Sequence, residues 1–190
     1  MCIQPFNVRI NKNFRDITES NIEFNTLEEI RNKTHLLFPY DNYALTFYHK
    51  KLFFFSATGE DFIVFGHDLE GYFVVSVKDG IIYHLTDNKD CDIPFSLVFC
   101  NTNINHFINF NNLFIFMVME QSRISGIETK NNINDEKIFD TLDRYYIECD
   151  PLAMNEDNFW YTRCYALRDG FFPTNNSQIE FYKEMMLKLS

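Results

Sequence analysis

The segment from Asp61 to Asn101 constrains the fold more than any other part of the chain. It alternates short runs of aromatic and β-branched residues with turn-forming residues, a pattern typical of antiparallel strands joined by tight connections. Asp79-Gly80 favours a two-residue type I′ turn, in which both central residues take a positive φ. We therefore predict a β-meander with strands over residues 62–66, 72–77, 81–85 and 95–100.

The order of side chains within the second strand predicts which of its faces is buried. Alternation places Phe73, Val75 and Val77 on one side of that strand, and we expect this side to face the core. Residues 44–55, which are rich in Tyr, Phe and Leu, are expected to contain a further strand.

Segments with helical signals flank the meander. A capping box from Thr26 to Glu29 predicts a helix over residues 27–36. After the last strand, Asn101 or Thr102 can cap a long helix that extends to about residue 122. Three further helices are predicted over residues 134–149, from Asn155 to Asp169, and from Ser177 onwards.

Apolar spacing predicts the buried faces of these helices. The long helix carries Phe107, Phe110, Phe114, Met117 and Val118 on one face. Its Phe116 lies in the polar stripe, where either other helices cover it or a partner contacts it. The next helix carries Ile138, Leu142, Tyr145 and Cys149 on its apolar stripe, and Trp160 is expected to anchor the core. A meander followed by helices that pack on it is an α+β domain.

Length and composition fit one domain. A chain of 190 residues suits a single domain, which we expect to span residues 1–190. A chain of this size, with 46% hydrophobic residues, can build a core without metal ions or disulfides. Residues 1–25 show little periodicity, and we expect either an irregular arm or an edge strand there.

The acidic balance bears on the kind of partner. The formal net charge is −10, and the longest basic run is His49-Lys50-Lys51. Direct nucleic-acid binding is therefore disfavoured, because contacts to phosphates need clusters of Lys and Arg. An acidic surface suits a basic protein partner, although acidity also serves solubility alone.

Neither a cofactor nor a membrane segment is expected. The five cysteines are odd in number and lack C-x-x-C spacing, so they indicate neither a zinc site nor a disulfide framework. Residues 1–14 contain no continuous apolar stretch of the kind that a signal peptide needs. Residues 104–119 are too short and too polar to span a bilayer. We expect a cytoplasmic protein with reduced thiols, no cofactor and no membrane partner.

Five carboxylates are predicted to gather at one end of the sheet. Successive strands of a meander alternate in direction, so the loops over residues 67–70 and 86–93 lie at the same end. These loops carry Asp68, Glu70, Asp87, Asp90 and Asp92. Loops on a rigid scaffold concentrate recognition residues, so this anionic end is a candidate for partner binding, although Asp is also common in ordinary turns.

One cluster could suggest chemistry instead. His67, Asp68 and Glu70 lie in one hairpin loop, and His84 could approach them from the third strand of the meander. A metal site or an acid–base site would need three or four convergent groups with supporting contacts. A solvated hairpin tip is the simpler interpretation. Since the chain also lacks the common catalytic and phosphate-binding motifs, we do not expect an enzyme.

Three segments carry a resemblance to a known family: Phe65 to Leu85, Val98 to Phe110, and Glu156 to Phe172. Together they resemble the SUKH superfamily, and specifically its fourth immunity branch. The segment from Phe65 to Leu85 is similar to the family's glycine-punctuated strand pair. Val98 to Phe110 is similar to its final strand and capped helix, and Glu156 to Phe172 to its late Trp-containing helix. The loop from His67 to Glu70 departs from the family's usual strand pair, which has more small residues there.

This resemblance implies a function that the residues alone do not. Members bind and neutralise bacterial polymorphic toxins, often nucleases or deaminases. We therefore expect this protein to bind a toxin domain and block it by steric and electrostatic occlusion, without a cofactor. Some eukaryotic relatives are regulatory scaffolds, so a scaffold that binds a cellular protein is the alternative. A hydrolase or metal-dependent enzyme built on His67, Asp68 and Glu70 is a third hypothesis.

Overall fold

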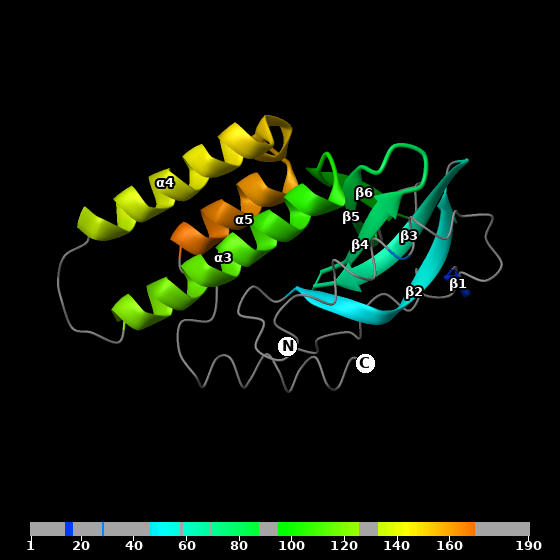
Figure 1. The fold of residues 1–190 in the computed structure, drawn as a ribbon, viewed down its shortest axis with the longest axis horizontal. Helices are drawn as coiled ribbons and strands as arrows, with labels where there is room; N and C mark the ends of the chain where they lie inside the picture. The colour runs from blue at the N-terminus through cyan, green and yellow to red at the C-terminus, as the bar shows by residue number, and fades with distance from the viewer. Residues whose placement is uncertain are drawn as a thin grey trace.

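The core of the structure is a six-stranded antiparallel sheet in which every strand lies beside its neighbour in sequence (Figure 1). The computed structural model describes residues 14–16, 28, 46–57, 59–68, 70–87, 95–125 and 133–169. Its strands are β1 (Arg15–Asp16), β2 (Phe47–Ala57), β3 (Glu60–His67), β4 (Tyr72–Ser76), β5 (Ile82–Asp87) and β6 (Phe95–Asn101). Its helices are α3 (Ile104–Ser125), α4 (Ile133–Cys149), the short 3₁₀ helix η2 (Pro151–Met154) and α5 (Phe159–Arg168). The predicted α+β meander is confirmed.

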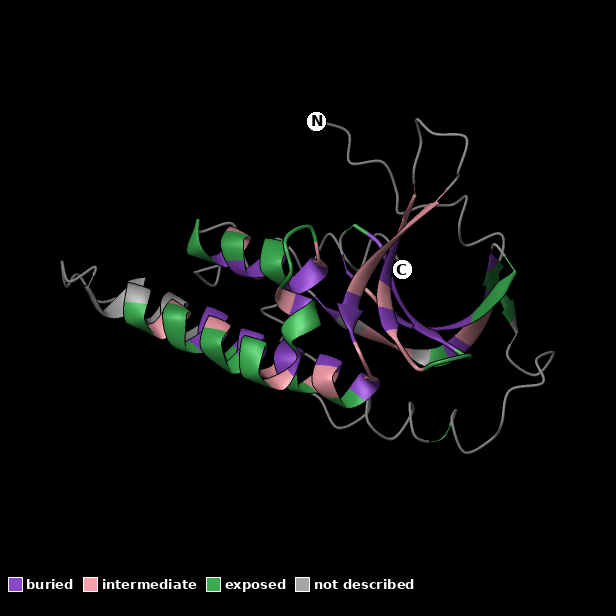
Figure 2. Cartoon of the chain, turned by 90° about the horizontal axis from the view of Figure 1, so that it is seen from above, coloured by how far each residue is buried: buried purple, intermediate pink, exposed green. Residues whose placement is uncertain are grey.

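One side of the sheet packs against the helices. Figure 1 shows α3, α4 and α5 lying alongside one another next to the sheet, and Figure 2 shows their buried residues turned inward. Trp160 is fully buried, and its ring lies 5.7 Å from the rings of Phe107, Phe110 and Tyr146. Trp160 is the core anchor that the sequence predicts. The predicted buried face of α3 is also confirmed, because all five of its residues are buried.

The opposite side of the sheet is buried as well. Phe62, Val64, Tyr72 and Val74 belong to a second apolar cluster, against which the Phe14 ring packs 4.9 Å from the ring of Tyr72. All five residues of β4 are therefore buried, which explains why this strand reads as an apolar run rather than as a polar–apolar alternation. Phe73 and Val75 face the helices as predicted, but Val77 lies beyond the strand and is 38% exposed.

The turn between β4 and β5 differs from the prediction. Gly80 has a positive φ of 75°, whereas Asp79 does not have a positive φ, so the connection is not a two-residue type I′ turn. The N–H of Gly80 donates to the carbonyl of Ser76, and the N–H of Ser76 donates to the carbonyl of Ile81. These bonds close a loop of residues 77–80, a longer connection in which a single glycine supplies the left-handed residue.

Helix boundaries and faces also depart from the sequence prediction. Asn103, rather than Asn101 or Thr102, caps α3, because its side-chain oxygen accepts the N–H of His106 at 3.0 Å. On α4, Tyr146 is fully buried and Tyr145 is 41% exposed, so the predicted stripe is wrong by one position there.

The helix predicted from Asn155 begins later. Pro151 opens η2 directly after α4, and α5 starts only at Phe159 with Asn158 as its N-cap. The fixed φ of proline favours a first helical position, which explains a separate short helix at this point.

Several predictions fall outside the described residues. These are the helix from Ser177 onwards, residues 1–25 apart from Phe14–Asp16, and the helix over residues 27–36 apart from Glu28, which is helical. None of the helices in the described part combines the length and the hydropathy that crossing a bilayer requires.

Replacing Phe73 by Ala should destabilise the fold strongly. Its side chain is fully buried, with rings of Phe107 and Phe159 at 4.9 and 5.3 Å, so truncation leaves a cavity that the packed rings cannot close. We expect a loss of about 3–5 kcal/mol in the free energy of unfolding, measured by denaturant titration. The control Val77→Ala, at an exposed position, should change it by no more than about 0.5 kcal/mol. Equal effects of the two substitutions would contradict this core assignment.

Candidate functional site

The loop between β3 and β4 is organised around the buried carboxylate of Asp68. This residue is only 4% exposed. Its Oδ1 accepts the backbone N–H groups of Glu70 at 2.8 Å and Gly71 at 2.9 Å, which fixes the loop around it. The ring of His84, from β5, lies with Nε2 2.9 Å from the same oxygen. His84 thus approaches the loop, which the sequence left open, and the predicted solvated hairpin tip is wrong for Asp68.

Gly71 is required by the closeness of this packing. A Cβ at Gly71 would lie 2.4 Å from the carbonyl oxygen of Leu85 and 2.9 Å from Nε2 of His84. Any side chain would therefore push the loop away from β5 and open the hydrogen bonds to Asp68. Glycine here serves close backbone approach rather than an unusual φ.

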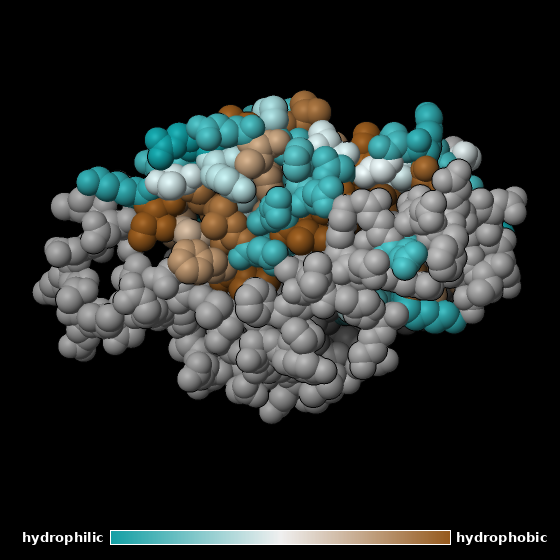
Figure 3. Space-filling model, viewed as in Figure 1, coloured by the Kyte–Doolittle hydropathy of each residue, from teal (hydrophilic) through white to brown (hydrophobic). Residues whose placement is uncertain are grey.

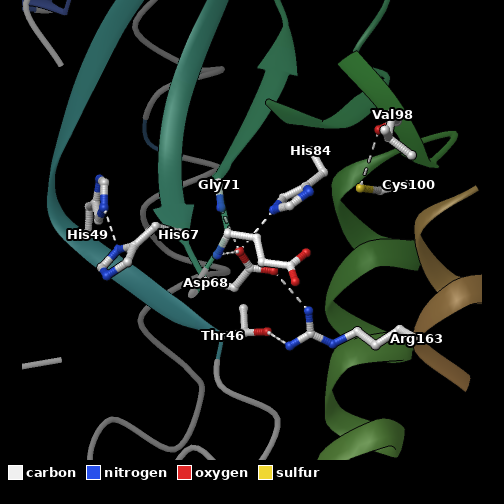
Figure 4. Close-up of polar contacts among 10 residues, drawn as sticks. Thr46, His49, His67, Asp68, Gly71, His84, Val98, Cys100 and Arg163 are labelled. Carbon is white, nitrogen blue, oxygen red and sulfur yellow. Dashed lines mark hydrogen bonds and ion pairs between the residues drawn. The ribbon is translucent and has the colours of Figure 1, made fainter. Parts of the chain in front are cut away.

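Arg163 completes the site from the helical side. Its Nη1 donates to Oδ2 of Asp68 at 3.0 Å, and Nη2 lies 3.5 Å from the hydroxyl of Thr46, just before β2 (Figure 4). The guanidinium carbon lies over the rings of Phe159 at 4.9 Å and Phe114 at 5.6 Å. Arg163 thus joins the loop, the start of β2 and two helices through one cation that is 8% exposed.

The electrostatics of this site keep Asp68 ionised. Burial by itself would raise the pKa of Asp68, but the charges of His84 and Arg163 and the donated hydrogen bonds outweigh it, and the pKa lies well below its ordinary value. A carboxylate held in this way accepts hydrogen bonds and has no proton to donate. It is therefore poorly suited to general-acid chemistry at neutral pH.

A second buried carboxylate, Asp150, fixes the junction between β6 and α3. Its Oδ2 accepts the backbone N–H of Thr102 at 2.8 Å and the side-chain amide of Asn101 at 3.1 Å. The indole N–H of Trp160 donates to Oδ1 of the same Asn101 side chain at 2.6 Å. The turn at the end of α4 is thereby linked to β6, to α3 and to α5 through side chains that are 0–1% exposed.

Two histidines form a separate pair on the other side of the loop. Nε2 of His49 and Nδ1 of His67 lie 2.8 Å apart (Figure 4). The His49 ring lies edge-on to the ring of Phe53, with the ring centroids 5.9 Å apart. Burial, assisted by the charge of His67, lowers the pKa of His49 from 6.5 to about 4. Burial also lowers the pKa of His67, against the opposing charge of Asp68. Both rings are therefore neutral at pH 7.

The structure separates the groups that could have formed a metal or acid–base centre. Asp68 turns inward to His84 and Arg163, whereas His67 pairs with His49. Within the described residues, no three His, Cys, Asp or Glu side chains converge in a way that could hold a metal ion. Burial raises the pKa of the Cys100 and Cys164 thiols, which disfavours the reactive thiolate form.

The five carboxylates predicted to bind a partner are not equivalent. Asp68 is buried and cannot present its carboxylate to a partner in this conformation. Glu70 is exposed beside it, and Asp87 is half-buried at the end of β5, at the same end of the sheet. Asp90 and Asp92 lie outside the described residues.

Sequence reasoning missed both Arg163 and Asp150. One signal for Arg163 was available, because it lies at helical spacing between Phe159, Trp160 and Leu167, on the apolar stripe of α5. A charged residue on such a stripe is rarely left unpaired.

Replacing Arg163 by Met should destabilise the protein because the Asp68 carboxylate would remain buried without its guanidinium partner. We expect a loss of about 3–5 kcal/mol in the free energy of unfolding. The matched control is Arg168→Met, which removes a more exposed arginine from the same helix and should cost about 0–1 kcal/mol. In a double-mutant cycle with Asp68→Asn the two losses should be clearly non-additive. Simple addition would mean that the two side chains are not coupled.

The histidine pair predicts a stability loss in mild acid. Because the pKa of His49 is lowered from 6.5 to about 4, the unfolded chain binds more protons than the folded one between these values. The contribution of the neutral, buried His49 ring to the free energy of unfolding is complete above pH 6.5 and is lost as the pH falls towards 4. His49→Phe, which keeps an aromatic ring there, should therefore flatten the dependence of the unfolding free energy on pH in this interval. An unchanged slope would contradict the assignment.

Comparison with known proteins gives one match. The family model of the SUKH-4 immunity protein covers residues 49–167, which is more than half of the 190 residues and runs from β2 almost to the end of α5. It therefore includes Asp68, Arg163, Asp150 and both histidines. Neither the curated proteins nor the solved structures contain a match to this chain. The extent of the family match establishes that the chain belongs to the SUKH-4 immunity protein family.

Proposed function

We propose that this protein binds a cognate bacterial toxin domain and neutralises it by steric and electrostatic occlusion, without catalytic turnover. The observation that carries the proposal is the family match over residues 49–167, which includes most of β2, the strands β3 to β6, the helices α3 and α4, nearly all of α5, and the buried residues Asp68, Arg163 and Asp150. Polymorphic toxins of this kind are often nucleases or deaminases. A basic nucleic-acid cleft on such a toxin would complement a chain with a net charge of −10.

The geometry around Asp68 supports a role for the anionic end of the sheet, which we define as Glu70, Asp87, Asp90 and Asp92. The backbone of Glu70 is held by the buried Asp68 carboxylate, while Glu70 itself is exposed. A loop that is already ordered loses less conformational freedom on binding than a flexible one. In this proposal Asp68 acts as a support for the loop, and the carboxylates of the anionic end approach the toxin.

We expect a toxin gene immediately upstream of the gene for this protein, and the toxin domain that it encodes tests the proposed function. The proposal expects that co-expression of this protein restores growth to cells that produce the toxin domain, and that the two purified proteins form a stoichiometric complex. Protection without a complex, or a complex without protection, would contradict neutralisation by occlusion.

Charge reversal at the anionic end should slow association with that toxin domain. Exposed charges mainly accelerate encounter, so Glu70→Lys should lower the association rate constant by roughly threefold to tenfold at low salt and flatten its salt dependence. Glu60→Lys is the matched control, because it makes the same charge change at an exposed residue at the other end of β3. Equal slowing by both variants would show that net charge alone steers the encounter, and no slowing by Glu70→Lys would exclude this end.

A further inference from the structure

The exposed apolar side chains of the described residues are concentrated in the helical half. Seven large hydrophobic residues are exposed, and five of them lie in the segment from α4 to α5: Tyr145, Ile147, Leu152, Tyr161 and Tyr165. Their exposed fractions range from 41% to 61%. Single exposed apolar residues are ordinary on protein surfaces. Several exposed apolar residues that lie together form a patch, and such patches mark interaction surfaces.

Helical spacing and one salt bridge place most of this set on a single surface. Tyr161, Tyr165 and Arg168 follow one another at intervals of four and three residues, so they share a face of α5. Arg168 donates to Asp143 of α4 at 2.5 Å. Ile147 lies one turn beyond Asp143 on α4, and it therefore faces the same seam between the two helices.

The connection between the helices extends the seam. Leu152 in η2 is 52% exposed, and its carbonyl accepts the side-chain amide of Asn158, which caps α5. We call the set Ile147, Leu152, Tyr161 and Tyr165 the hairpin face. Tyr145 is not part of it, because a separation of two residues turns it about 200° away from Ile147 on α4.

The charges near the hairpin face are mainly negative. Glu148, Glu156 and Asp157 are exposed in the same segment, and the side chain of Asp140 is 79% exposed. Figure 3 shows hydrophilic side chains gathered over α4, with apolar side chains reaching the surface beside them. Tyrosines rimmed by carboxylates suit a partner whose surface combines an apolar depression with basic residues.

We propose that the hairpin face holds the toxin domain after encounter, with Tyr161 and Tyr165 as its main anchors. This inference rests on the proposed immunity function and assigns a second contact region to it, apart from the anionic end of the sheet. A second copy of the chain is a poorer occupant, because two such faces would bring like charges together in a protein whose net charge is −10. The chemistry of the occupant is thus a basic protein surface.

The test measures how fast the complex with the expected toxin domain dissociates. Tyr161→Ala combined with Tyr165→Ala should raise the dissociation rate constant by about tenfold or more, with little change in the association rate. Tyr145→Ala is the control, because it removes the same side chain at 41% exposure, against 42% for Tyr161, from another side of the helical hairpin. The control should bind like the wild type. Tyr165→Ala alone, at 61% exposure, should act in the same direction and is the milder substitution.

Each other outcome separates this inference from the proposed function. If the wild-type protein does not bind the toxin domain, the proposed function fails before the surface is tested. If the wild type binds and the double variant dissociates at the same rate, the hairpin face is excluded while the immunity function stands. Equal weakening by Tyr145→Ala would also overturn the assignment. So would a wild-type dimer in sedimentation that the double variant converts to a monomer, because a second copy would then occupy the face.

Discussion

The buried ion pair between Asp68 and Arg163 is the interaction on which the arrangement of the fold depends. It joins two residues that are 95 positions apart, one in the connection from β3 to β4 and the other in α5. Removing both charges from water is costly, and their attraction recovers that cost only with good geometry and further hydrogen bonds. Asp68 has these further bonds from Glu70, Gly71 and His84. The pair therefore specifies where α5 sits against the sheet more than it adds to net stability.

Asp150 plays the same part at the other junction of sheet and helices. Its hydrogen bonds to Asn101 and Thr102 connect the end of α4 to the junction of β6 and α3. Asn101 in turn accepts a hydrogen bond from the indole N–H of Trp160. Residues 159–168 are thus held at two places, by Trp160 and by Arg163, which lie one turn apart on the same helix. Such a doubly fixed helix can present its outer side chains in a defined position, and contacts with a preorganised surface cost less entropy.

The sequence predicts local elements well and long-range polar contacts poorly. The strands of the meander follow from apolar runs separated by turn-forming residues, and the buried face of α3 follows from apolar residues spaced three to four apart. The structure reproduces both closely. Asp68 looked like a solvated turn residue because its partner, Arg163, comes from a helix that no local pattern relates to the loop. Tyr145 and Tyr146 are chemically equal neighbours, so spacing alone could not decide which one packs on Phe110 at 3.8 Å. The turn after Ser76 depends on the closing hydrogen bonds, which the Asp79-Gly80 dipeptide does not determine.

The burial of Asp68 limits which carboxylates the protein can offer to the proposed basic partner. With that carboxylate committed to the interior, the described part of the anionic end offers Glu70 and the half-buried Asp87 to a partner. Exposed charges steer encounter over about a Debye length, but they hold a complex only weakly because water and salt screen them. Lasting contact needs side chains that lose their water. Among the described residues, five of the seven exposed large apolar side chains lie in the segment from α4 to α5, and none lies at the Glu70 end of the sheet. Since Arg163 joins α5 to the same loop that carries Glu70, the buried ion pair holds the two surfaces proposed to contact the toxin domain in a fixed arrangement.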